Sequence, residues 1–572
     1  MYLVKKIRDI YGLDDRAILL FKFFLGLVIL SDIALRAMMV DTIFTDEGIL
    51  PRWVQVKSFT EAWRFDLFLA TGNRYIVLFL LVINSYLVWL FMTAKKNVRL
   101  ITFGVWIFLI SAQSRNFLIL QSGDSILRLV LFWFLFFPET SQGLHSRFSI
   151  SSNNKKINLG VMAYYLQIAL IYFFAGYAKS YESYFSKGDA VFLAMELERY
   201  STPFGQWLMK FPVLLKTLTR LSYLFELSCP FLILVPIKNW IFRTIAIFSA
   251  FSFHIGTILM MEVGHFPHAA MVMWLPLIPS QVLDFFFRSD KKTVEFVVEY
   301  EKKGVLEWML SQVFFLKSAE LKWQKKLKLQ SEKRVYRVDG EETSCDNFHR
   351  ILFSHSFFHL FLDNKLFRGF FLLLVNFENI MTELVSINKA KLIFFGKVVV
   401  NSLLIFLIYF TFVFNLSQLN TNSFRWKKII NKTTENNFLR YGVYLDQAWG
   451  MFSPIPTLQD GWHLVYGERI NGNKVDLWGT DFTKPFEKPR DVAGTYKNFR
   501  WRKYLGALMG DGYKGYKQYF WRNICSEVNS KIVDPMRKIK KVHHYFILEQ
   551  TNLDGTVSPL EKKKYGEYKC NL

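Results

Sequence analysis

The sequence predicts a mainly α-helical membrane protein that crosses the bilayer about nine times and carries a C-terminal, extracytoplasmic, β-rich α+β domain. Of 572 residues, 52% are hydrophobic and 18% aromatic, yet the formal charge is +24. The apolar residues gather into long runs with Lys and Arg between them, as in polytopic membrane proteins. Because the basic residues flank apolar spans, topology and anionic lipid explain the charge better than nucleic acid does, and no nucleic-acid partner is expected.

The first apolar run, about 17–40, is longer than the core of a signal peptide, and we interpret it as a retained helix. Eight more runs divide the chain into a helical bundle (1–286), a basic cytoplasmic or interfacial segment (287–390), a last span (391–414) and a soluble domain (415–572). The stretch 354–377 either lies at the interface or spans, and its charged interruptions favour the interface. The later runs are 74–94, 98–114, 117–138, 158–178, 216–236, 240–262, 265–286 and 391–414.

Basic residues mark every second connection between the runs. The positive-inside rule therefore places the N-terminus in the cytoplasm and the C-terminal domain outside. The marking residues are Lys5/Lys6, Lys95/Lys96/Arg99, Arg147/Lys155/Lys156, Lys238/Arg243 and Arg288/Lys291/Lys292.

From about residue 441 the pattern becomes that of a water-soluble domain. The segments 461–470 and 474–479 flank Asn471-Gly472-Asn473, a sequence typical of a tight hairpin turn. A second hairpin is expected after 542–550, with helices between the two. Cys525 and Cys570 both fall here, and either pair or remain free thiols. The four cysteines lack the spacing of a zinc site, so no metal is expected.

Ionisable residues inside the spans are costly and usually face a bundle interior or a cavity. In the predicted topology they concentrate in the outer leaflet. Each i,i+4 pair taken singly is explained by helix packing, and His254 alone by a hydrogen-bonded core position. Together they predict a polar cavity that opens outward. The set comprises Asp32/Arg36, Arg115/Asn116, Asp124/Arg128, Lys179, Glu226, His254, Glu262 and His265.

Lys179 ends an apolar run, Tyr172-Phe173-Phe174-Ala175-Gly176-Tyr177-Ala178-Lys179. A lysine at this position either anchors the helix at the headgroups or, half-buried, acts as a base with His254 as its partner. The chain has no P-loop, Gly-x-Ser-x-Gly or His-Glu-x-x-His motif, so nucleotide hydrolysis and the common hydrolase mechanisms are not indicated.

Several motifs in this order resemble the HTTM family, the bacterial relatives of vitamin K-dependent gamma-carboxylase. They are Phe44-Thr45-Asp46-Glu47-Gly48-Ile49-Leu50-Pro51, Gly123-Asp124-Ser125-Ile126-Leu127-Arg128-Leu129, Ala175-Gly176-Tyr177-Ala178-Lys179, Phe253-His254, Asp446 to Pro454, and Arg500-Trp501-Arg502-Lys503-Tyr504-Leu505.

The resemblance implies a carbon–carbon lyase that uses a reduced, vitamin K-like quinone to carboxylate a glutamyl side chain. It places the carboxylase's proposed base on Lys179 and a Phe-His pair on Phe253-His254. The chain departs from the carboxylase branch at Ser114 to Leu118, which lacks that branch's histidine and tyrosine. We therefore expect an enzyme acting at the membrane on a lipophilic or secreted peptide substrate, or alternatively a non-catalytic protein that binds a partner through its outer domain.

Overall fold

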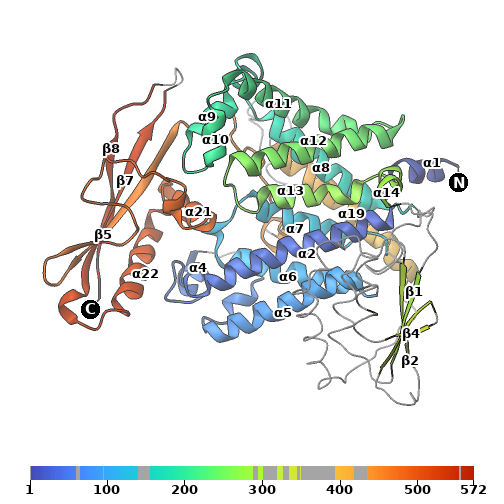
Figure 1. Cartoon of the computed structure of the whole chain (residues 1–572), viewed down its shortest axis with the longest axis horizontal. Coiled ribbons are helices and arrows are strands. Elements are labelled where there is room, and N and C mark those ends of the chain that lie inside the picture. Colours follow the sequence, from blue (N-terminus) through green and yellow to red (C-terminus); the bar gives the residue numbers. More distant parts are fainter. Residues whose placement is uncertain are drawn as a thin grey trace.

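The computed structural model of the chain consists mostly of helices, which form one central bundle with a small sheet at each end (Figure 1). It describes residues 2–58, 65–94, 96–139, 155–287, 294–300, 319–325, 334–339, 341–343, 348, 393–417, 434–436, 438–552 and 556–571. The predicted segment 354–377 lies outside these residues.

The bundle is built from ten longer helices, with α1 (Tyr2–Tyr11) leading into it. These are α2 (Asp15–Met38), α5 (Arg74–Thr93), α6 (Val98–Arg115), α7 (Ser122–Phe134), α8 (Leu159–Tyr177), α11 (Pro212–Leu234), α12 (Asn239–Met260), α13 (Phe266–Trp274), α14 (Ser280–Phe287) and α19 (Ile393–Ser417). Short helices connect them: α3 (Val40–Ile43), α4 (Arg52–Ser58), η1 (Leu67–Leu69), η2 (Phe117–Ile119), η3 (Glu182–Ser186), α9 (Ala190–Glu196), α10 (Pro203–Leu208) and η4 (Leu275–Leu277).

Polar caps fix where the long helices begin. The Asp14 carboxylate accepts from Arg16 N at the start of α2, and the Asn73 side chain accepts from Tyr75 N at the start of α5. The Asn158 side chain does the same for Val161 N at the start of α8. Such side-chain acceptors satisfy backbone N–H groups that have no partner inside the helix.

Five described helices are long and apolar enough to cross a membrane: Asp15–Met38, Arg74–Thr93, Leu159–Tyr177, Asn239–Met260 and Val400–Ser417. The pair Phe266–Leu277 and Ser280–Phe287, bent by 96°, raises this to six if it counts as one span. α7 has only 13 residues, and α11 carries Lys216, Arg220 and Glu226. The expected count of nine therefore stays a prediction, while a helical chain with several membrane-compatible spans is confirmed.

The C-terminal region contains the expected strands and helices. Its antiparallel sheet has the order β6-β5-β7-β8, formed by β5 (Gln459–Arg469), β6 (Lys474–Asp476), β7 (Ile539–Gln550) and β8 (Glu561–Lys569). Gly472, in the predicted hairpin turn, has a φ of 86°, which glycine adopts without strain. The region between β6 and β7 forms η7 (Gly494–Tyr496), α21 (Phe499–Ala507), η8 (Asp511–Tyr516), α22 (Lys517–Asn529) and η9 (Pro535–Arg537); η6 (Phe438–Gly442) precedes the sheet.

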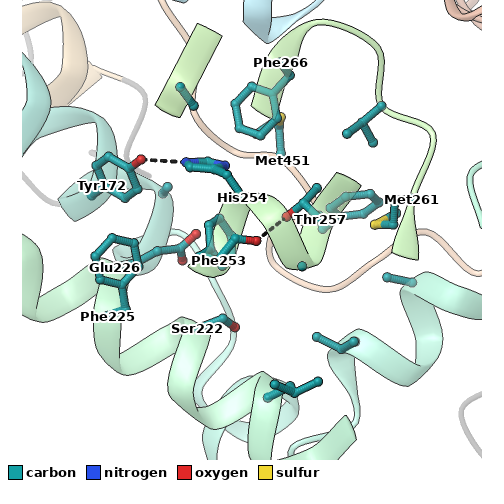
Figure 2. A pocket seen from close by; sticks show the side chains of 18 of the residues that line it. Tyr172, Ser222, Phe225, Glu226, Phe253, His254, Thr257, Met261, Phe266 and Met451 are labelled. Atoms are coloured by element: carbon teal, nitrogen blue, oxygen red, sulfur yellow. Dashed lines mark hydrogen bonds between the residues drawn. The ribbon is translucent and has the colours of Figure 1, made fainter. Parts of the chain in front are cut away.

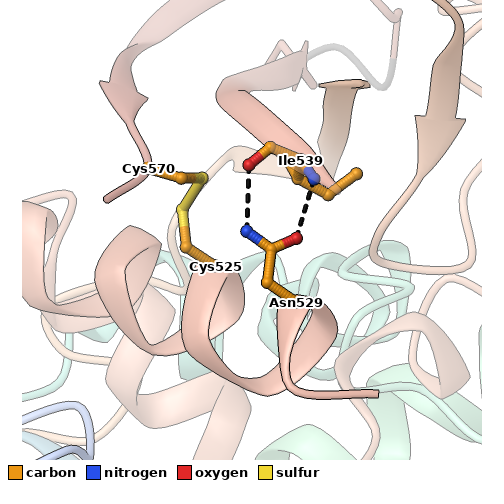
Figure 3. Close-up of a disulfide and its surroundings, with 4 residues drawn as sticks. All are labelled: Cys525, Asn529, Ile539 and Cys570. Carbon is orange, nitrogen blue, oxygen red and sulfur yellow. Dashed lines mark hydrogen bonds between the residues drawn. A yellow bond between two sulfur atoms is a disulfide. The ribbon is translucent and has the colours of Figure 1, made fainter. Parts of the chain in front are cut away.

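A disulfide joins Cys525 of α22 to Cys570, just beyond β8 (Figure 3). Beside it, the Asn529 side chain donates to the Ile539 carbonyl at 3.0 Å and accepts from Ile539 N at 2.7 Å. The covalent bond and the amide pair together fasten α22 across the ends of β7 and β8.

A second sheet, which sequence patterns did not indicate, occupies part of the basic segment 287–390. It comprises β1 (Val294–Tyr300), β2 (Ala319–Lys325), β3 (Arg334–Val338) and β4 (Glu341–Thr343) in the order β2-β1-β3-β4. β1 pairs parallel to β2 and antiparallel to β3. This sheet and the C-terminal sheet lie at opposite ends of the bundle (Figure 1).

Candidate functional site

A cavity of about 400 Å³ lies among α8, α11, α12 and α13 (Figure 2). Its lining is mainly apolar and aromatic, with Lys179, Glu226 and His254 as its ionisable members. Small-molecule sites usually combine an apolar lining with a few convergent polar groups, so this cavity is the candidate site.

The Lys179 ammonium donates to the Glu226 carboxylate, and both side chains are buried, with 8% and 5% exposed. Lys179 Nζ also lies 5.0 Å from the centre of the Tyr184 ring, within range of a cation–π contact. A lysine that anchors a helix at headgroups turns its amine outward. Lys179 instead turns inward to a carboxylate, which argues against the headgroup-anchor interpretation.

Gly176 explains how two helices bring this pair together. A Cβ at Gly176 of α8 would lie 3.1 Å from the Glu226 Cβ on α11. A glycine allows this close approach, whereas a side chain at this position would press against the Glu226 and Leu227 side chains of α11. The small-residue step before Lys179 thus sets the spacing of the Lys179–Glu226 pair.

His254 sits on a hydrogen-bonded chain of aromatic side chains. Trp274 Nε1 donates to the Tyr172 hydroxyl at 2.9 Å, and the same hydroxyl lies 2.7 Å from His254 Nε2. Because an indole N–H only donates, the hydroxyl proton is free to be donated to Nε2. We therefore assign the neutral tautomer with its proton on Nδ1, an atom that has no hydrogen-bond partner among the described residues.

The segment between the last span and the C-terminal sheet forms one wall of the cavity. Trp449, Met451 and Phe452 line it, and the Tyr184 hydroxyl donates to the Phe452 carbonyl at 2.8 Å. Deeper in the bundle, the Gln167 side chain donates to the Gln447 side chain at 2.7 Å. The site is therefore built jointly by the helices and the C-terminal region.

Asp32 and Arg36 form the expected ion pair at 2.8 Å, but within a larger cluster. Arg36 also contacts Asp124 at 3.2 Å. Arg500 of α21 bridges both carboxylates, at 2.5 Å from Asp32 and 2.8 Å from Asp124. Two carboxylates and two guanidinium groups thus balance in charge, and all four side chains are buried. The cluster joins α2 and α7 to the C-terminal region and does not line the cavity.

Arg128 does not form the pair with Asp124 that their i,i+4 spacing predicted. Its guanidinium donates to the Tyr444 carbonyl at 3.1 Å and lies 3.1 Å from an Asp446 carboxylate oxygen. Asp124 is occupied by Arg36 and Arg500, whose chain positions gave no sign of this contact. Competition from a distant part of the chain therefore overrides the local spacing.

Arg115 and Asn116 hold backbone rather than line the cavity. Arg115 donates to the carbonyls of Leu50 and Phe44 at 2.8 and 2.9 Å, and the Asn116 side chain accepts from Leu118 N. Both side chains are buried, and their role is to hold neighbouring backbone segments in place.

Glu262 and His265 also lie away from the three ionisable cavity residues. The Glu262 side chain is 58% exposed, and its backbone carbonyl accepts from Arg502. His265 Nε2 lies 3.0 Å from the Ser31 hydroxyl and lines a separate cavity against α2. The predicted polar set therefore divides into the cavity, the Arg500 cluster and scattered structural contacts.

Sequence reasoning missed Tyr172, Trp274, Tyr184 and Arg500 as members of these sites. Tyr172 could have been found by helical spacing, since it precedes Lys179 by two turns on the same run. Arg500 carried no such signal, because only the tertiary fold places it beside Asp32 and Asp124.

No protein-family model matches the chain, and no curated protein or solved structure matches it either.

Proposed function

We propose that this chain is a membrane-embedded, gamma-carboxylase-like enzyme whose Lys179–Glu226 pair handles a proton inside the apolar cavity. The supporting observation is the burial of that pair beside His254 in one cavity of about 400 Å³. In an apolar lining, an ion pair is held at a high desolvation cost. Transfer of the lysine proton to Glu226 leaves a neutral amine and a neutral acid, and the free amine is then a base.

The residues fit a reduced quinone as the cofactor. A quinone or quinol oxygen accepts hydrogen bonds, and His254 Nδ1 is a buried donor with no partner among the described residues. Phe253 and Phe266 supply flat apolar surfaces beside the His254 ring (Figure 2). When bound, a reduced quinone would supply, through its reaction with molecular oxygen, the strong base that glutamyl carboxylation requires.

In this proposal the chain's own residues position and move protons. His254 would orient a bound ring through Nδ1. Lys179, after passing its own proton to Glu226, would accept the proton of the ring hydroxyl at Nζ. The partner substrate is a lipophilic molecule or the glutamyl side chain of a secreted peptide. The HTTM resemblance supports the proposal because two of its motifs, Ala175 to Lys179 and Phe253-His254, meet at this cavity.

We propose further that the protein lies in a bacterial inner membrane with its N-terminus in the cytoplasm and its C-terminal domain outside. The Cys525–Cys570 disulfide supports an oxidising compartment for that domain. A cysteine introduced at exposed Lys563 should react with a membrane-impermeant thiol reagent in intact spheroplasts, while one at Lys5 should react only after lysis. The reverse pattern would contradict this orientation.

Replacing Lys179 with alanine tests the function. Oxygen uptake by membranes supplied with a reduced naphthoquinone should fall by at least about 100-fold, the usual contribution of a positioned base. Glu226→Gln should reduce it as well, because the amine then has no carboxylate to take its proton. Lys187→Ala is the matched control, since this lysine pairs with Glu182 on the surface. Unchanged uptake in Lys179→Ala with normal expression would disprove the base assignment.

The alternative function is non-catalytic binding through the outer domain. β8 is the edge of the C-terminal sheet, pairs only with β7 among the described strands, and exposes Lys562, Lys563 and Lys564. A free edge strand is a common docking site for an extended peptide. On this alternative, reversing the charge of the exposed edge with Lys563→Glu and Lys564→Glu weakens partner binding, whereas Lys179→Ala has no effect.

A further inference from the structure

The cavity has an unusual wall where α11 meets α12. The rest of the lining is mainly a mixture of aliphatic and aromatic side chains, whereas this wall contains four small residues, three of them serines: Ser222 on α11, and Ser249, Ser252 and Gly256 on α12. Two further lining residues, Leu221 and Phe248, are 57% and 72% exposed. A side chain that both lines a cavity and lies on the outer surface marks a point where the two meet. The cavity therefore reaches the surface between these helices.

Gly256 shows that this wall is open rather than tightly packed. Among the described residues, a Cβ placed at Gly256 would have a single neighbour within 4 Å, the Met260 Cε at 3.7 Å. At Gly205, which also lies near the cavity's outer end, a Cβ would lie 2.5 Å from the Met260 carbonyl oxygen. The space beside Gly256 is thus available to something other than the protein's own side chains.

The surface at this opening is apolar. α12 is one of the five membrane-compatible helices, and 22% of its apolar window is buried, the lowest share of the five. Its outward side chains include Ile245, Ile255 and Leu259, each between 47% and 51% exposed. In the proposed orientation the opening therefore faces the hydrocarbon of the outer leaflet and not water.

The far end of the same space is polar. His254 precedes Gly256 by two residues on α12, so the two point to different sides of the helix, but both line the same cavity. In the tautomer assigned above, Nδ1 of His254 is a donor without a partner among the described residues. Lys179 and Glu226 complete this end. The space therefore matches an amphiphilic ligand. Its hydrogen-bond-accepting head would lie at the buried donor, and its apolar chain would lie towards the hydrocarbon.

We infer that the opening between α11 and α12 is a lateral portal, through which a lipid with a carbonyl-bearing ring and a linear apolar tail enters from the bilayer. The ring lies at His254, and the tail passes Gly256, Ser252 and Phe248 and stays in the membrane. Access from lipid avoids moving the apolar tail through water, which is unfavourable for every CH₂ group that becomes hydrated. The identity of the head rests on the proposed function, whereas the portal rests on the helix pair alone.

Two probes separate head from tail: a decyl-substituted benzoquinone, and the same ring with a methyl group in place of the decyl chain. Their binding to the full chain in phosphatidylcholine nanodiscs is measured by quenching of tryptophan fluorescence, at matched mole fractions in the lipid. The decyl compound should bind severalfold more tightly than the methyl compound at the same mole fraction, because its chain makes van der Waals contacts along the portal that a methyl group cannot make.

Gly256→Leu and Ser252→Phe place side chains in the portal. Each should remove the advantage of the decyl chain and leave methyl-ring binding unchanged, which also shows that the variant is folded. Ile245 lies on the outer face of α12 and outside the cavity lining, so Ile245→Phe should change neither decyl-quinone binding nor methyl-quinone binding. Undiminished decyl binding in both portal variants, or no binding of either quinone to the native protein, would overturn the inference.

The proposed function fails separately. Full oxygen uptake in Lys179→Ala would disprove the base assignment. The portal would still be tested by the difference in binding between the decyl and methyl compounds, and by the disappearance of that difference in Gly256→Leu.

Discussion

At the level of single residues, the chain places its charges in two different settings. Lys179 and Glu226 line a cavity, whereas Asp32, Arg36, Asp124 and Arg500 form a closed cluster in which every charge has a partner. A buried pair facing empty space is available for chemistry, while a saturated cluster is available only for holding helices together. This distinction separates the candidate catalytic residues from the structural ones.

Arg500→Met should destabilise the protein by about 3–5 kcal/mol, because it leaves two buried carboxylates facing one guanidinium. The measurement is thermal unfolding of the purified protein in detergent. Adding Asp124→Asn should recover part of the loss by restoring the charge balance. Lys503→Met, at an exposed position on the same helix, is the control and should have little effect. Equal stability of Arg500→Met and native protein would show that the cluster does not hold the two regions together.

Individual residues also show where sequence reasoning succeeds and where it stops. The Asp32–Arg36 pair follows from i,i+4 spacing and was predicted correctly. The same rule was wrong for Asp124 and Arg128, because Arg500 and Asp446 compete for them from more than 300 positions away. Local spacing cannot anticipate partners that only the tertiary fold supplies.

At the level of elements, the close approach of α8 and α11 sets the geometry of the site. Gly176 allows it, since a Cβ there would lie 3.1 Å from the Glu226 Cβ and 3.1 Å from a Leu227 methyl group. The five long apolar helices, the hairpin at Gly472 and the helical character of 499–529 followed from apolar runs and turn residues. The short helices α4, α9 and α10 did not. The sheet β1–β4 did not either, because its short strands lie in a lysine-rich stretch without clear alternation.

Gly176→Val should lower quinol-dependent oxygen uptake about as much as Lys179→Ala does, because it separates α8 from α11 and breaks the ammonium–carboxylate contact. Gly104→Val is the matched control. It is also a helical glycine, but a Cβ there meets only Leu87 side-chain atoms at 3.4 Å and beyond. Retained activity in Gly176→Val would mean that the Lys179–Glu226 distance does not control the chemistry.

At the level of the whole molecule, the C-terminal region contributes residues to the cavity and to the helical bundle. Phe452 and Met451 line the cavity, Gln447 bonds inside the bundle, and Arg500 completes the charge cluster. A sheet lies at each end of the bundle, which fits one soluble region on either side of a membrane (Figure 1). The boundary expected near residue 415 therefore separates sequence patterns rather than independent units.

The assignment of the cavity as an active site is tested most directly by a cryo-EM map of the protein in nanodiscs with the decyl-substituted quinone. We predict ring-shaped density inside the cavity, with one ring oxygen within hydrogen-bond distance of His254 Nδ1 and the other ring oxygen towards Lys179. The chain should leave the cavity between α11 and α12. A cavity filled by the protein's own side chains, or quinone density only on the outer surface of the bundle, would contradict it.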